Sequence, residues 1–308
     1  MLAPRPGRAG PNASRARESN DRPDCSRQRP ETPEIHTGRP HLNWLAKACI
    51  LVFMAPNSRL QSREFEDLIT CTRGEGSYRN AWDGYRSLIL EIARQGERPR
   101  LLEIGGGREP LLSQADVTEL LCEYTINDID AGELALAPAW VKRLHGDVAD
   151  PTLLDPAKHE GQYDLVFSRM VFEHVEHPDQ GYRNIARLLA PGGILVNFVP
   201  TLYAAPFVLN RFLPERLSAR ILRRVFPDRN PHEIPKFPAY YRWCTTTKRT
   251  QKKLDSAGFR DTKIVPFYGH GYYSKIPILR GLAERFWPVA ERHDWRSLST
   301  YGYIIGEG

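Results

Sequence analysis

The sequence predicts an α/β fold, a doubly wound and mostly parallel sheet of seven strands, on three observations. Short apolar runs alternate with segments of helical periodicity from about residue 98 to the end. Strands that alternate with helices form parallel sheets through right-handed crossovers. Glycines or acidic residues follow several of the apolar runs, and ligands of such sheets bind at the carboxyl ends of strands. With 41% hydrophobic residues in 308, the chain has enough apolar side chains for a sizeable core.

Residues 1–53 are expected to be a disordered, basic tail. Their first 40 or so positions are rich in Pro, Arg, Gly and Ser and lack an apolar period, so they cannot offset the entropy of ordering. The tail holds nine Lys and Arg against five Asp and Glu, which accounts for four of the six net positive charges. The remaining domain, 54–308, is therefore close to neutral and does not indicate nucleic-acid binding. Met54 is a candidate for the native start, and a real, flexible basic arm is the alternative.

The cysteines and the apolar segments indicate a cytoplasmic protein. Cysteines without a C-x-x-C pair are interpreted as reduced thiols and not as a disulfide frame or zinc site. The apolar run at 44–55 is shorter than the roughly 20 residues that span a bilayer, and the acidic residues before it make it a poor signal peptide. The five cysteines are Cys25, Cys49, Cys71, Cys122 and Cys244.

The elements are expected in the following order. Two helical patterns, 58–72 and 80–95, precede the first strand and could cover a ligand pocket, with Asn80 as a cap of the second. The first strand, 101–104, ends in three glycines, and Pro110 suits the first turn of the helix after them. Further strands are expected at 122–128, 141–144, 163–168, 194–199, 261–267 and 299–305, and further helices at 111–121, 132–136, 179–189 (closed by Pro191-Gly192-Gly193), 247–257 and 276–291.

Gly105, Gly106 and Gly107 form the loop around which the site is expected. Glycines let the backbone turn sharply and approach a ligand closely, and the following helix would direct free N–H groups toward that ligand. A dinucleotide-binding loop needs a third glycine where Pro110 stands, and the Gly-Lys-Ser/Thr of a P-loop is absent. What remains is an acid, Glu103, two residues before a glycine cluster.

Five motifs together resemble those of the class I S-adenosylmethionine-dependent methyltransferases. They are residues 102–107 (Leu-Glu-Ile-Gly-Gly-Gly), 127–130, 146–148, 163–175 and 187–193. The set covers about residues 98 to 200 and most resembles the small-molecule branch that includes the ubiquinone and menaquinone methyltransferases. The resemblance implies a Rossmann-like methyltransferase fold, S-adenosyl-L-methionine as cofactor, and methyl transfer to a small or medium-sized acceptor through oxygen, nitrogen or carbon. Arg108-Glu109-Pro110 departs from the family pattern, which usually has a small residue after the glycines.

By this resemblance, the residues after the strand ends bind the cofactor. Asp128 would accept the ribose hydroxyls, with Asp130 as a rival for this role or as a helix cap. Asp147 would accept the adenine amine and Val148 would offer a backbone N–H. A lone Asp after a strand is more often a cap or turn residue, and it is the ordered set that favours a site. The predicted cofactor-binding residues are Glu103, Gly105, Gly106, Gly107, Asp128, Ile129, Asp147, Val148, Ser168 and Arg169.

His174 follows the fourth predicted strand, near the expected methyl group. It could act as a general base toward a hydroxyl, because imidazole titrates near neutral pH. The alternative is a packed histidine that fixes its loop. Glu173 and His174 could also hold a divalent ion, but further clustered ligands are missing and we expect no metal site.

Residues 201–246 are expected to be an insertion that forms a lid over the acceptor. Within it, 208–226 has apolar residues at helical spacing opposite arginines, which fits a lid helix with a solvated basic face or a helix lying on anionic lipid. A long loop dense in Pro and aromatic residues follows and should line the acceptor pocket, with Lys236 or Arg242 available to an acidic acceptor. A role of these aromatics in the core is the alternative. The predicted acceptor residues are Tyr240, Tyr241, Arg242 and Trp243.

Three other functions compete with this one. An RNA or protein methyltransferase is disfavoured by the near-neutral body and by the missing Asn/Asp-Pro-Pro-Tyr/Phe tetrad. A non-catalytic module that binds the cofactor or only keeps the fold stays open. A nicotinamide oxidoreductase is disfavoured by Pro110. The expected partner is therefore a small molecule and not a nucleic acid.

Overall fold

The computed structural model describes residues 58–74, 76–152, 159–202, 238–271 and 277–308. All of these residues belong to one compact unit, Lys47–Gly308. The predicted tail, 1–53, and the predicted lid or lipid-binding helix, 208–226, lie outside the described residues.

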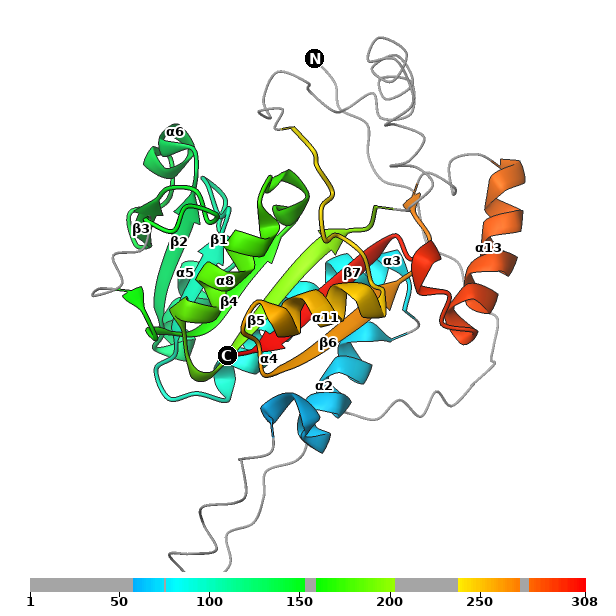
Figure 1. Ribbon diagram of the computed structural model, residues 1–308, viewed down its shortest axis with the longest axis horizontal. Coiled ribbons are helices and arrows are strands. Elements are labelled where there is room, and N and C mark those ends of the chain that lie inside the picture. The colour runs from blue at the N-terminus through cyan, green and yellow to red at the C-terminus, as the bar shows by residue number, and fades with distance from the viewer. Residues whose placement is uncertain (1–57, 75, 153–158, 203–237, 272–276) are drawn as a thin grey trace, which may run out of the picture. The chain divides into compact units, whose positions relative to one another are not determined.

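In this part of the chain, seven strands form one sheet, in line with the sequence prediction. They are β1 (Arg100–Ile104), β2 (Glu123–Asp128), β3 (Lys142–His145), β4 (Tyr163–Arg169), β5 (Leu189–Pro200), β6 (Asp261–Phe267) and β7 (Tyr301–Glu307). Their spatial order is β3-β2-β1-β4-β5-β7-β6 (Figure 1). Only β7 runs antiparallel to its neighbours, β5 and β6. This confirms the doubly wound fold, including the final strand between the fifth and the sixth.

Helices cover both faces of the sheet and create two apolar cores (Figure 1). Successive residues of a strand point to opposite faces, so Leu101 packs with the helices that precede β1, whereas Leu102 and Ile104 pack with the later helices α8 and α11. The described helices are α2 (Arg63–Arg73), α3 (Tyr78–Asp83), α4 (Tyr85–Arg94), α5 (Gln114–Leu120), α6 (Ala131–Ala135), α8 (Pro178–Leu188), α11 (Lys248–Ser256) and α13 (Pro277–Arg292), with short 3-10 turns η1 (Arg59–Gln61), η2 (Phe172–His174) and η3 (Arg296–Leu298).

The N-terminal helices differ from the prediction of one continuous helix over 80–95. The segment forms α3 and α4, which meet at Gly84. A Cβ at Gly84 would lie 2.8 Å from the carbonyl oxygen of Thr72 in α2. The junction of α3 and α4 can therefore pack this closely against α2 only because residue 84 is glycine. Asn80 does not cap the helix. Ser77 is the cap, and the Asn80 side chain donates to the Arg73 carbonyl at 3.0 Å.

The helix after the glycine loop also starts later than predicted. A capping box fixes its start, because Ser113 Oγ accepts from the Asp116 N–H and the Asp116 carboxylate accepts from the Ser113 N–H. Pro110 therefore lies outside α5. One of the free N–H groups at the start of α5, that of Asp116, already donates to the Ser113 hydroxyl. The start of α5 is also absent from the wall of the cavity described below, so its predicted role in ligand binding stays a prediction.

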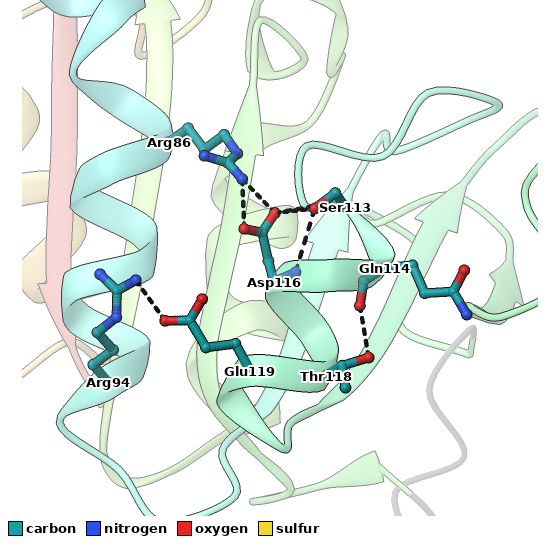
Figure 2. A network of polar contacts seen from close by, with 7 residues as sticks. All are labelled: Arg86, Arg94, Ser113, Gln114, Asp116, Thr118 and Glu119. Atoms are coloured by element: carbon teal, nitrogen blue, oxygen red, sulfur yellow. Dashed lines mark hydrogen bonds and ion pairs between the residues drawn. The ribbon is translucent and has the colours of Figure 1, made fainter.

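Two arginines of α4 hold α5 in place (Figure 2). Arg86 contacts both carboxylate oxygens of Asp116 at 2.5 Å, and Arg94 contacts Glu119 at 3.0 Å. The acid that caps α5 is thus the same residue that ties it to α4. In the interior of the sheet, β5 begins at Leu189, so Pro191-Gly192-Gly193, which was expected to close the preceding helix, lies within the strand. The strand is irregular there, because Leu189 pairs with Tyr163 and Ile194 with Leu165.

Candidate functional site

The strand register brings the ends of β1, β2 and β4 to one edge of the sheet. Ile104, the last residue of β1, pairs with Asn127 of β2 and Ser168 of β4. Asp128 at the end of β2 pairs with His145 of β3. The loops after these strands border a cavity of about 860 Å³, which is within the usual size range of small-molecule sites.

The glycine loop presents bare backbone to this cavity. Gly105 and Gly107 have φ values of 71° and 47°, which L side chains rarely adopt. A Cβ at Gly105 would lie 2.4 Å from Val171 Cγ2, so no larger residue fits there. The N–H groups of Gly105 and Gly106 donate to the Asn127 carbonyl at 2.7 and 3.1 Å. The loop is therefore held in its strained conformation by β2.

Glu103 lies beneath the glycine loop and not on the cavity wall. Its carboxylate accepts from the Leu111 N–H at 3.0 Å and from the Tyr124 hydroxyl. Burial raises the pKa of Glu103 to about 7. Alternation along β1 explains this position, because it turns Glu103 toward the face that α4 and α5 cover. The structure thus gives Glu103 a role in fixing the loop from Gly106 to Leu111, and its contact with the cofactor stays a prediction.

Ser168 is likewise buried and absent from the cavity wall. Its hydroxyl donates to Asn197 Oδ1 at 2.8 Å, and its carbonyl accepts from the Tyr85 hydroxyl at 2.6 Å. These contacts join β4, β5 and α4. The predicted cofactor residues that do line the cavity are Gly105, Gly106, Gly107, Asp128, Ile129, Asp147, Val148 and Arg169.

Asp128 and Asp130 have different surroundings, which separates two roles that the sequence left open. The Asp130 carboxylate accepts from the N–H groups of Gly132 and Glu133 and so caps α6. Asp128 is half-buried on the cavity wall, and its Oδ1 accepts from the Asp130 N–H at 2.9 Å. Burial raises the pKa of Asp128, and the negative charges of Asp130 and Glu133 add to this effect. A ligand that donates hydrogen bonds would offset that cost.

Asp147 is a more exposed acid on the same wall. Its Oδ1 accepts from the Ala149 N–H at 2.8 Å, as in a turn. The loop that carries it is held by Asn127, whose amide donates to the carbonyls of Leu144 and Gly146 at 2.9 Å each. Asn127 was missed as a site residue, although it stands directly before Asp128.

The sequence prediction also missed an ion pair between the glycine loop and α6, in the part of the cavity wall that follows β1, β2 and β3 and is called the cofactor end below. The Arg108 guanidinium makes two contacts of 2.6 Å with the Glu133 carboxylate, and both residues line the cavity. The pair joins the glycine loop to α6. It lies close to Gly107, because a Cβ added at Gly107 would be 3.7 Å from Glu133 Cβ. The departure of Arg108 from the family motif therefore has a structural consequence at this position.

The turn after β4 and the segment from Pro238 form a second part of the cavity wall, called the acceptor end below, and this part carries His174. Its Nδ1 lies 2.9 Å from the Pro238 carbonyl. Since a carbonyl can only accept, Nδ1 carries the proton and Nε2 is the nitrogen able to take one up. Nε2 lies 3.8 Å from Glu173 Oε1, and burial raises the pKa of Glu173 to about 8. His174 is thus both packed against its loop and placed at the cavity, so the geometry allows both roles considered from the sequence.

The segment that starts at Pro238 is fastened to the turn around His174. The N–H groups of Tyr240 and Tyr241 donate to the Glu173 carbonyl at 2.7 and 3.1 Å. Arg242 donates to the Glu176 carbonyl at 2.7 Å. Of the four predicted acceptor residues only Tyr240 lines the cavity, together with Glu176 and Pro238, which were not predicted.

Trp243 has the core role that was the alternative for these aromatics. Its ring stacks on the buried ring of Tyr182 with 5.6 Å between centroids. Tyr241 also packs against the core on this face of the sheet. The aromatic spacing therefore reflected packing more than a ligand pocket.

The residues of the cofactor end fit an adenosyl sulfonium cofactor. The glycines form a cradle that a Cβ would fill. Asp128 and Asp147 supply acceptors for hydroxyl and amine donors, and the cavity is large enough for a nucleoside with an amino-acid arm. Among the described residues, no group of three or more His, Cys, Asp or Glu could hold a metal ion. Fold and site together define a class I methyltransferase.

Comparison with known proteins agrees with this class. A family model described as a methyltransferase domain matches residues 77–232. A ubiquinone biosynthesis O-methyltransferase of Marinobacter nauticus is 34% identical over 156 residues, which are 47% of this chain and 59% of that protein. An uncharacterized protein of Synechococcus sp. is 37% identical over 113 residues, or 35% and 27% of the two chains. The chain thus spans less than two thirds of the length of these relatives.

Some solved structures of methyltransferases are similar to this chain at low sequence identity. One is the phosphoethanolamine N-methyltransferase 2 of Haemonchus contortus, solved in complex with S-adenosyl-L-methionine. Its sequence is 14% identical and the TM-score is 0.45, and the alignment covers 81% of this chain and 58% of that protein. The family match decides the classification. The chain belongs to the methyltransferase domain family, as a class I S-adenosylmethionine-dependent methyltransferase with S-adenosyl-L-methionine as cofactor.

Proposed function

We propose that the chain transfers the methyl group of S-adenosyl-L-methionine to an oxygen, nitrogen or carbon atom of a small or medium-sized molecule. The observation that supports this most is the single cavity that has Gly105–Gly107 and Asp128 at one end and His174 and Tyr240 at the other. The name of the Marinobacter nauticus relative, a ubiquinone biosynthesis O-methyltransferase, agrees with a small acceptor.

The cofactor supplies a methyl group on a positively charged sulfur, which keeps the electron pair of the broken bond. The protein contributes position. Asp128 would accept hydrogen bonds from ribose hydroxyls, Asp147 from the adenine amine, and the glycine loop allows close approach of the amino-acid arm. Holding the two bound reactants in line can supply a large part of the rate enhancement over the uncatalysed reaction. A base is needed only when the acceptor loses a proton, and His174 Nε2 is then its receiver.

A labelled-transfer experiment tests this proposal. Purified protein is incubated with methyl-labelled S-adenosyl-L-methionine and fractionated cell extracts, and labelled products are identified by mass spectrometry. We expect label in a low-mass product and loss of this label in the Asp128→Ala variant. Label in the RNA or protein fraction would overturn the acceptor class. No transfer despite intact binding of S-adenosylhomocysteine would favour a non-catalytic cofactor-binding module.

Two further proposals concern location and the lid. The described part of the chain includes no helix with the length and hydropathy of a membrane span. We propose a cytoplasmic location, which the reduced thiols of Cys122 and Cys244 in the described part of the chain support. We also propose that residues 201–246 serve as the acceptor lid. The position of Pro238 and Tyr240 on the cavity wall supports this assignment.

A further inference from the structure

Helix α13 carries a row of large apolar side chains on its exposed side. Leu282, Phe286 and Val289 are 64%, 41% and 40% exposed, and their spacing of four and three residues places them on one face of a helix. The row continues past the helix to Trp295 and Leu298, which are 42% and 37% exposed. In Figure 1, α13 (orange) stands apart from the helices that cover the sheet.

Charges on α13 are divided between two faces. Arg285 and Arg292 follow Leu282 and Val289 by three residues each and so lie along the apolar row. The acids lie on the opposite face. Glu291 pairs with Arg73 of α2 at 3.3 Å, and Glu284 pairs with Arg280 at 3.8 Å. Over residues 280–292, the face with the apolar row therefore combines apolar side chains with arginines and carries no acid, whereas the exposed Glu284 lies on the opposite face.

Basic groups also border the far end of the row. A shallow hollow of about 620 Å³ is lined by Trp295 and Leu298, by the basic residues Lys248 and Arg296, and by one acid, Asp294. The guanidinium of Arg296 pairs with Asp294 at 2.7 Å. Lys248 stands at the start of α11 and contributes a further positive charge beside the tryptophan. Aromatic and aliphatic side chains next to Lys and Arg are the composition of interfacial helices.

We propose that α13, with Trp295 and Leu298, binds the surface of an anionic phospholipid membrane. The apolar row would enter the headgroup region, and Arg285, Arg292 and Lys248 would reach the lipid phosphates. A second copy of the chain fits this face less well, because a two-fold contact would bring Arg285 and Arg292 of both copies together, and the nearest acid, Asp294, already pairs with Arg296. None of these residues lines the cavity at the strand ends, so the proposal is independent of the proposed activity.

Vesicle co-sedimentation of the full chain tests the proposal. We expect binding to vesicles of equal phosphatidylglycerol and phosphatidylcholine, weakened by salt, and no binding to pure phosphatidylcholine. Reversing two charges, Arg285→Glu with Arg292→Glu, should lower the partition coefficient at least about tenfold. Leu282→Ser with Val289→Ser should also lower it. Phe286 is left unchanged, because its ring packs on Trp287 at 5.0 Å.

Two controls make the result decisive. Arg63→Glu with Arg183→Glu makes the same charge change on α2 and α8 and should bind vesicles like the unchanged protein. Titration with S-adenosylhomocysteine should be the same for all variants, which shows that the fold and the cofactor site are intact. Absence of vesicle binding by the unchanged protein, or equal binding by the α13 variants, overturns the proposal. A dimer in analytical ultracentrifugation that the α13 variants dissociate, without vesicle binding, would assign the face to a second copy.

Discussion

The two ends of the cavity are built in different ways. At the cofactor end, short loops follow neighbouring strands, and the loop after β1 is bonded directly to β2 through the Asn127 carbonyl. At the acceptor end, the turn around Glu173 is joined to Tyr240 and Tyr241, more than sixty residues later, by backbone hydrogen bonds. The sheet fixes the first end, whereas the second depends on contacts between distant segments. Changes at the acceptor end should therefore leave cofactor binding intact.

The largest effect is expected from Gly105→Ala. The new Cβ would lie 2.4 Å from Val171 Cγ2 at a φ of 71°, and moving the loop should weaken binding of S-adenosylhomocysteine at least about 100-fold, from crowding added to a backbone cost of about 1 kcal/mol. Gly161→Ala is the matched control, with a φ of 65° and no atom within 4 Å. Equal affinities of the two variants in titration calorimetry would show that the cradle does not hold the cofactor.

His174→Ala tests the acceptor end. With an acceptor that loses a proton, the transfer rate should fall roughly 100-fold, while the affinity for S-adenosylhomocysteine changes by less than about twofold, because the sheet fixes the cofactor end. His177→Ala, an exposed histidine outside the cavity wall, is the control and should leave both unchanged. Parallel loss of cofactor affinity would contradict the separation of the two ends.

The two acids of the cofactor end should differ in effect. Asp128→Ala should weaken binding of S-adenosylhomocysteine by about 30-fold, because a half-buried carboxylate makes charged hydrogen bonds shielded from water. Asp147→Ala should weaken it by only about threefold, because Asp147 is exposed. Calorimetric titration of both variants at one ionic strength gives the comparison. The reverse ranking would mean that the site is oriented differently along the rim.

The smallest effect is expected on the pH dependence of stability, through Glu173 in the turn that carries His174. Burial raises the pKa of Glu173 from 4.5 to about 8. The folded state then binds more protons than the unfolded state, so stability falls as pH rises from about 4.5 to 8. Glu173→Gln removes this dependence and should raise the free energy of unfolding at pH 9 by about 2 kcal/mol. Urea unfolding at pH 5 and 9 measures it, with exposed Glu64→Gln as control. An unchanged slope with pH would mean that Glu173 is not buried.

The cofactor end was largely predictable from sequence and the acceptor end was not. Strand ends meet at one edge of a parallel sheet, so the order of Gly105, Asp128 and Asp147 along the chain was enough to expect them on one rim. Glu103 and Ser168 belong to the same motifs, but their side chains are buried on a face of the sheet. Successive side chains of a strand point to opposite faces, so this outcome is decided for each residue separately.

Residues whose role depends on a distant partner could not be found in this way. Arg108 acquires its role from Glu133, and Tyr240 from Glu173, through tertiary contacts that leave no spacing signal. Among the aromatics after the insertion, Trp243 packs in the core and Tyr240 lines the cavity, although both fit the same pattern. The start of α5 was misplaced because a capping box at Ser113 overrides the helix preference of Pro110.

Calorimetric titration of the unchanged protein with S-adenosylhomocysteine tests the central claim, that the rim of the sheet beside Gly105 holds an adenosyl cofactor. We predict one binding site per chain, weakened at least about 100-fold by Gly105→Ala and kept in Gly161→Ala. Absence of binding, or binding that survives Gly105→Ala and Asp128→Ala unchanged, would contradict it.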